Sequence, residues 1–230
     1  MVDCAEPLHL WGALEQQSSY EWYVGRRGGL HEMYEHYRQL LQVLCGPDGT
    51  TIGTHLVLKS PHHTFHLPSI ASAFGPKPSV FIWLHRQPVS VVGSCCSMNL
   101  HFREYMSAGF ESPATLGART LERLAACITK AMADRAVLEA AGHTFVDIRY
   151  DDLMADAVGV IRKLYATVGL QFEEEFGRRI EGHLAEGRAA RQKGGGAGGG
   201  GRGHSYSLEM FGLSKEDVEA AFATYMRKYL

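Results

Sequence analysis

The chain has 230 residues, of which 45% are hydrophobic and 21% charged, and its formal net charge is −2. These values are typical of a globular protein with a substantial core, and the near-neutral charge excludes the global basic field that attracts nucleic acid or anionic lipid. The longest apolar stretches are strand-length, far short of the roughly 20 residues of a membrane helix, and the N-terminus lacks a signal-peptide core. We therefore expect a cytoplasmic protein with no membrane segment and no nucleic-acid partner.

The first half of the chain predicts two strands, each followed directly by a helix. Apolar residues at three- and four-residue steps predict an amphipathic helix over residues 30–44. The segment THLVLK, residues 54–59, is predicted to be a buried strand, and residues 62–74 a helix. A second strand is predicted over 79–85, and Pro88 suits the first turn of the helix that follows. This order is typical of a βαβα unit with a parallel sheet.

The second half of the chain predicts one more strand and several helices. A long helix is expected over residues 120–142, and a third strand over 143–150. Helices are then predicted over 156–170, over a more polar surface segment at 171–192, and over 214–230.

One domain accounts for the whole chain. No internal repeat is present, so residues 1–230 are predicted to form a single α/β domain with a flexible glycine-rich insertion at 192–203. Ser214, with Asp217 three residues later, predicts the N-terminal cap of the last helix. The five cysteines include no CxxC pair, which indicates free thiols in a reducing compartment.

Basic residues follow the first two predicted strands. Lys59 and His63 come after one strand and Arg86 after the next. In parallel sheets, ligands bind beyond the carboxyl ends of the strands, and clustered cations there suit a polyanionic phosphate ligand. Ser94 lies on a polar stripe of the helix that follows Arg86.

Four segments carry a family resemblance. In chain order, they resemble segments of the PAPS-dependent sulfotransferases, specifically the broad bacterial-type branch. The resemblance covers most of residues 15–230 and implies a P-loop-NTPase-like sulfotransferase fold with a parallel sheet flanked by helices. The segments are LVLKSPHH at 56–63, HRQPVSVVGSCCS at 85–97, IRYDDLMADAVGVIRKLYATVGL at 148–170 and GHSYSLEMFGLS at 203–214.

The resemblance implies a nucleotide site. PAPS, 3′-phosphoadenylyl sulfate, would be the co-substrate, and Arg86 and Ser94 have the eight-residue spacing of the pair that holds its 3′-phosphate in the family. Tyr150 stands where the family has a tyrosine on the adenine side.

The resemblance also implies the chemistry. Lys59 would stabilise charge on the sulfuryl group and its leaving phosphate, and His63 would be the general base. His62 is the competing base if the local alignment is off by one. The acceptor would be a hydroxyl or amine of a small molecule, lipid or carbohydrate, and the reaction needs no metal.

The sequence departs from the family pattern in two places. The Pro-Arg-Ser-Gly-Thr-Thr type of loop that cradles the 5′-phosphosulfate has no counterpart, so we expect an N-terminally truncated version of the fold. Near the C-terminus, His204 and Tyr206 keep a His-x-Tyr pattern, whereas Ser205 stands where a basic residue is common and Arg202 lies close by.

Three other interpretations remain open. A catalytically inactive remnant or fragment, acting as a nucleotide- or protein-binding module, would explain the absent loop. A metal site at His62 and His66 has helical spacing but lacks the HExxH glutamate. A P-loop kinase or nucleotidase would require GxxxxGK[ST], which the sequence does not contain.

Overall fold

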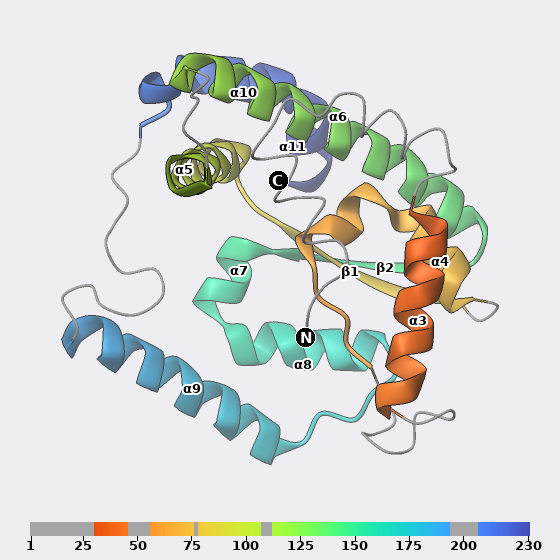
Figure 1. Cartoon of the computed structure of the whole chain (residues 1–230). Coiled ribbons are helices and arrows are strands. Elements are labelled where there is room, and N and C mark those ends of the chain that lie inside the picture. The colour runs from red at the N-terminus through yellow and green to blue at the C-terminus, as the bar shows by residue number, and fades with distance from the viewer. Residues whose placement is uncertain (1–29, 46–55, 76–77, 107–111, 194–206) are drawn as a thin grey trace.

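Helices surround a small parallel sheet (Figure 1). The computed structural model describes residues 30–45, 56–75, 78–106, 112–193 and 207–230. The predicted α/β class with a parallel sheet is confirmed for these residues.

Two strands form the described sheet. Strand β1 (Val80–His85) and strand β2 (Thr144–Arg149) are rich in β-branched and aromatic residues and pair in parallel, with His85 opposite Arg149. Because the strands run in the same direction, their carboxyl ends lie at one edge of the sheet. Both of these strands were predicted.

Helix α6 (Pro113–Ala140) and helix α4 (Leu67–Phe74) cover one face of the sheet. In Figure 1, α6 lies on one side of the strands, and helices α7 (Tyr150–Ala155) and α8 (Ala157–Thr167) lie on the other. The rings of Phe81, Trp83 and Phe145 point toward α4 and α6 because alternate residues of a strand share a face. They pack against a cluster of buried residues from these two helices: Leu67, Ala71, Ala131 and Leu138.

The opposite face is only partly covered. Helices α7 (Tyr150–Ala155) and α8 (Ala157–Thr167) contact β2. On the same face of β1, the side chains of Val80, Ile82 and Leu84 are 47–49% exposed. The covered half of this face therefore belongs to β2.

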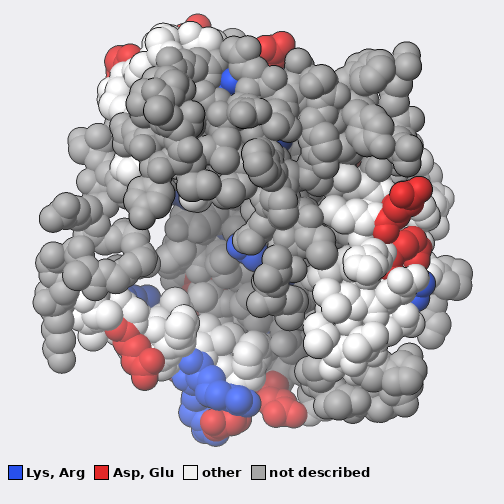
Figure 2. Space-filling view, viewed as in Figure 1, with Lys and Arg blue, Asp and Glu red and all other residues white. Residues whose placement is uncertain are grey.

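Helix α9 (Glu174–Lys193) lies on the surface and contacts α8, as its polar sequence predicted. Arg162 of α8 pairs with Glu174 at 2.5 Å, and within α9 Arg178 pairs with Glu175 at 2.6 Å. Figure 2 shows charges of both signs side by side in the region of α9, in keeping with the small net charge. The helix continues two residues into the expected insertion at 192–203, and the remainder of that insertion lies outside the described residues.

The C-terminal segment forms two short helices instead of the single helix predicted over 214–230. Helix α10 (Lys215–Ala221) and helix α11 (Ala223–Tyr229) meet at Phe222, whose φ of −106° and ψ of 12° leave the helical range. The ring of Phe222 is buried in the core, so tertiary packing interrupts the periodic pattern. The predicted cap is confirmed, because Ser214 and Asp217 form a reciprocal capping box.

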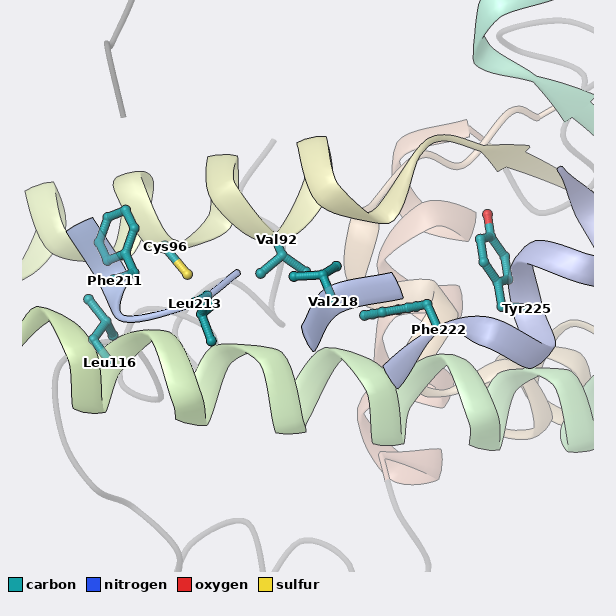
Figure 3. Close-up of a cluster of buried hydrophobic side chains, with 8 residues drawn as sticks. All are labelled: Val92, Cys96, Leu116, Phe211, Leu213, Val218, Phe222 and Tyr225. Atoms are coloured by element: carbon teal, nitrogen blue, oxygen red, sulfur yellow. The ribbon is translucent and has the colours of Figure 1, made fainter. Parts of the chain in front are cut away.

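A second apolar cluster joins this segment to the middle of the chain (Figure 3). It connects helix α5 (Pro88–Met106) and α6 with the short 3₁₀ helix η2 (Glu209–Phe211), α10 and α11. The buried members of the cluster are Val92, Cys96, Leu116, Phe211, Leu213, Val218, Phe222 and Tyr225.

Helix α3 (His31–Cys45) confirms the amphipathic helix predicted near the start of the described chain. Its buried Tyr34 packs against Ile70 and Ala73 of α4. This contact fixes α3 beside the segment that carries the predicted histidine base.

The predicted buried strand at residues 54–59 is wrong for its described part. Residues 56–60 have no regular secondary structure, and Leu56 and Val57 are 52% and 81% exposed. A strand requires a backbone partner, and none of the described residues pairs with the free edge of β1. The first two residues of the predicted strand lie outside the described chain.

The single helix predicted over residues 62–74 is also corrected. The structure has a 3₁₀ helix η1 (Pro61–Phe65) and then α4, separated by His66 with φ −136° and ψ 34°. Pro68 explains the break, since a proline is tolerated in the first turn of a helix but removes a hydrogen bond from its interior.

Candidate functional site

Two of the predicted site residues meet at the carboxyl edge of the sheet. Arg86 directly follows β1, and Tyr150 begins α7 directly after β2. The guanidinium carbon of Arg86 lies 4.7 Å from the centre of the Tyr150 ring, a cation–π contact between residues far apart in the sequence. Arg86 is exposed and Tyr150 is half-buried, so the pair forms a charged and stacking surface open to a ligand.

Ser94 lies on α5, the helix that begins at Pro88 just after Arg86. Its side chain is exposed, whereas Val92 and Cys96 on either side are buried in the core cluster. Buried neighbours two residues away hold the helix against the core and leave Ser94 facing solvent.

Lys59 and His63 lie where the chain enters η1. Lys59 is exposed, and Ser60 caps the 3₁₀ helix by accepting a hydrogen bond from the backbone N–H of His62 at 3.3 Å. His63 is half-buried, and its Nδ1 lies 3.0 Å from the hydroxyl oxygen of Tyr34 on α3.

The three neighbouring histidines have different environments. The side chain of His62 is buried and its ring stacks near Phe65, with 6.1 Å between centroids. His66 is more than half-buried, and burial, together with the charge of Lys130, lowers its pKa from 6.5 to about 4. His63 is thus the one of the pair at 62 and 63 whose side chain is partly accessible.

The structure adds a partly buried polar network that the sequence analysis did not identify. His85, 1% exposed at the end of β1, has its Nε2 2.7 Å from Asp147 Oδ1 and its Nδ1 3.0 Å from the Tyr225 hydroxyl. Burial lowers the pKa of His85 despite its hydrogen bond with Asp147, so the ring is neutral at neutral pH. A detectable signal was present in the sequence, because His85 takes the inward position after Phe81 and Trp83, where a polar side chain needs partners.

Arg135 of α6 completes this network from the other side of Asp147. Its guanidinium donates to both carboxylate oxygens, at 2.5 and 2.9 Å, and its Nε donates to Glu139 at 2.8 Å. Burial opposes the charge, but these hydrogen bonds outweigh it and raise the pKa of Arg135. The same guanidinium lies within 6 Å of the ring centres of Trp83, Phe145 and Tyr229.

The described cysteines form no disulfide, and two of them have raised thiol pKa values. Cys45, Cys95, Cys96 and Cys127 are free thiols, as predicted for the described part of the chain. Burial raises the pKa of Cys96 to about 11 and that of Cys127 to about 12, so neither is an activated thiolate.

No group of three or more metal-ligating side chains occurs within the described ranges, and His62 and His66 have no third ligand there. In the same ranges, none of the helices combines the length and apolar character needed to cross a membrane. Arg202, His204 and Tyr206 lie outside the described residues.

Comparison with known proteins decides the family. The sequence model of the sulfotransferase family matches residues 9–174, well over half of the chain. The chain belongs to the sulfotransferase family. No curated protein matches it.

Two solved sulfotransferases share the fold. Sulfotransferase STF9 from Mycobacterium avium superposes with a TM-score of 0.75 at 21% identity, over 95% of this chain and 52% of that one. Sulfotransferase STF1 from Mycobacterium tuberculosis H37Rv gives a TM-score of 0.53 at 28% identity, over 73% of this chain and 39% of that one. This sulfotransferase-family chain therefore spans about half the length of STF9 and less of STF1.

Proposed function

We propose that the chain carries the PAPS site of a sulfotransferase, which moves a sulfuryl group from PAPS to a hydroxyl or amine of a small molecule, lipid or carbohydrate. The observation that carries the proposal is the contact between Arg86 and Tyr150 at the carboxyl edge of a parallel sheet. An exposed guanidinium suits the 3′-phosphate, and the neighbouring ring suits a flat purine. Ser94, exposed on the helix after Arg86, would donate a hydrogen bond from its hydroxyl group to the same phosphate.

His63 and Lys59 would act on the other end of the nucleotide. His63 would take the proton of the acceptor as its oxygen or nitrogen bonds to sulfur. The bond between sulfur and the bridging phosphate oxygen breaks, and adenosine 3′,5′-bisphosphate leaves with that electron pair. Lys59, exposed at the entrance to η1, would stabilise the charge that develops on the departing oxygen.

A second candidate is a binding module without catalysis. It is supported by the half-exposed apolar side chains of Val80, Ile82 and Leu84, and by exposed Leu56 and Val57. Apolar surface of this kind is commonly covered by another segment or a partner. In this alternative the nucleotide site would bind but not turn over PAPS.

Calorimetric titration of the chain with adenosine 3′,5′-bisphosphate and with AMP, at one salt concentration, tests the proposal. We expect a Kd near 1 μM for the bisphosphate, about −8 kcal/mol, and at least tenfold weaker binding of AMP, which lacks the 3′-phosphate. A folded chain that binds neither nucleotide, or both equally, would contradict the site. Bisphosphate binding without PAPS consumption, across phenol, alcohol and amine acceptors, would favour the binding module.

A further inference from the structure

The C-terminal helix contacts the residue that directly precedes Arg86. Tyr225 of α11 is buried, and its hydroxyl lies 3.0 Å from Nδ1 of His85, the residue just before Arg86. Figure 3 shows the Tyr225 hydroxyl pointing toward the connection between β1 and α5.

The direction of each hydrogen bond follows from the chemistry. An ionised carboxylate only accepts hydrogen bonds, so the Nε2–H of His85 donates to Asp147. Nδ1 of neutral His85 is then an acceptor, and the Tyr225 O–H donates to it. Burial raises the pKa of Tyr225 to about 12, so the hydroxyl keeps its proton at neutral pH.

The far end of this chain of hydrogen bonds is anchored. Arg135 donates to both oxygens of Asp147 and is itself 7% exposed, enclosed by three aromatic rings. The orientation of Tyr225 is therefore fixed through His85 and Asp147 to helix α6. His85, Tyr225 and Arg135 are buried and hydrogen-bonded, and such a network is rigid, which suits a positioning role.

The same C-terminal segment also packs on the helix that carries Ser94. Val92 and Cys96, the buried neighbours of Ser94, belong to the cluster with Val218 and Phe222 (Figure 3). One segment thus contacts both His85, which precedes Arg86, and the helix of Ser94. Arg86 and Ser94 are the two residues assigned to the 3′-phosphate.

We propose that Tyr225 is a positioning residue of the nucleotide site, which holds His85 and through it the adjoining Arg86, so that the guanidinium meets the 3′-phosphate. The proposal rests on the proposed function, because it assigns Arg86 to that phosphate. It extends the site to the last helix of the chain, which the sequence motifs did not include.

The matched pair Tyr225→Phe and Tyr229→Phe tests this role. Both residues lie on α11, but the Tyr229 hydroxyl is buried without a hydrogen-bond partner among the described residues, so its removal breaks no such bond. Each variant and the wild-type chain would be titrated with adenosine 3′,5′-bisphosphate and with AMP, after thermal unfolding has shown that they are folded. We expect Tyr225→Phe to weaken bisphosphate binding about tenfold and AMP binding less than twofold, whereas Tyr229→Phe changes neither.

The possible outcomes separate the two proposals. If the wild-type chain does not discriminate between the nucleotides, both proposals fail. If it does discriminate and Tyr225→Phe matches Tyr229→Phe, or loses affinity equally for both nucleotides, only the positioning role is overturned. Should Tyr225→Phe not fold, His85→Gln changes the other partner of the same hydrogen bond. The same selective loss of affinity for the bisphosphate is then expected.

Discussion

The hydroxyl oxygen of Tyr34 lies 3.0 Å from Nδ1 of His63, although 29 residues separate the two in the sequence. Tyr34 is 1% exposed and packed between α3 and α4, so its hydroxyl is a fixed point. As a base, His63 would act through Nε2, because Nδ1 is engaged by Tyr34. Nε2 must then be unprotonated, so in this tautomer Nδ1–H donates to the Tyr34 hydroxyl oxygen.

Tyr34→Phe should release His63 without disturbing the core, because the phenyl ring still fills the same space. We expect turnover of PAPS to fall roughly tenfold, with little change in KM for PAPS, since orientation of the base is lost and nucleotide contacts remain. Nitrogen-15 spectra of labelled histidine provide a readout independent of the acceptor. They should show a single His63 tautomer in the wild-type chain and an averaged pair of resonances in the variant; identical spectra would argue against the role.

Arg86→Ala should remove the preference for a 3′-phosphate. Because Arg86 is exposed, the melting temperature of the variant should stay within a few degrees of that of the wild-type chain. Its affinity for adenosine 3′,5′-bisphosphate should fall at least tenfold, toward the affinity for AMP. Arg86→Lys is the matched control, since it keeps the charge but loses the planar group that stacks on Tyr150. Intermediate affinity is expected for Arg86→Lys, and full affinity in Arg86→Ala would exclude Arg86 from the site.

Sequence patterns predicted the features that depend on residues close together in the sequence. The short apolar run of β1, the helix end at Gly142 with φ 93° and the cap at Ser214 are all local signals, and each appears in the structure. Arg86 and Tyr150 were assigned to one nucleotide by the family resemblance, and their contact itself comes from the structure, in which parallel strands end at the same edge.

Sequence patterns failed where the local structure depends on contacts between residues far apart in the sequence. Residues 56–60 are apolar enough for a strand, yet no described strand pairs with them. The helix break at Phe222 and the bond of Tyr225 to His85 are set by packing between elements far apart in the chain. No periodicity encodes such contacts, so the part of the site contributed by α11 required the structure.

Gly117→Ala should destabilise the chain, although alanine favours helices. A Cβ at this position of α6 would lie 2.1 Å from the carbonyl oxygen of Phe211, so η2 would have to move away. We expect a loss of about 1–3 kcal/mol in the free energy of unfolding, measured by urea denaturation. Gly182→Ala on α9, where a Cβ would meet no atom within 4 Å, should instead add about 0.5–1 kcal/mol. Equal effects at the two positions would contradict the close approach at Phe211.

Acid should destabilise the chain through His66. Burial and the charges of Lys130, His62 and His63 lower its pKa from 6.5 to about 4, and only Asp134 opposes them. The unfolded chain binds a proton near pH 6.5 and the folded chain only near pH 4, so stability present above pH 6.5 is lost as the pH falls between these values. The full loss is on the order of 3 kcal/mol, with about 2 kcal/mol of it reached by pH 5.

His66→Gln should reduce the loss of unfolding free energy at acid pH, because glutamine binds no proton in the folded or the unfolded state. Urea denaturation at pH 7.5 and pH 5 would give the difference in unfolding free energy for the wild-type chain and for the variant. His85, whose pKa burial also lowers, contributes in the same direction, so we expect the variant to keep a reduced slope rather than none. His31→Gln, at an exposed position of α3, serves as the control and should follow the wild-type slope. Parallel slopes in His66→Gln and the wild-type chain would show that His66 is protonated to the same extent in the folded and unfolded states.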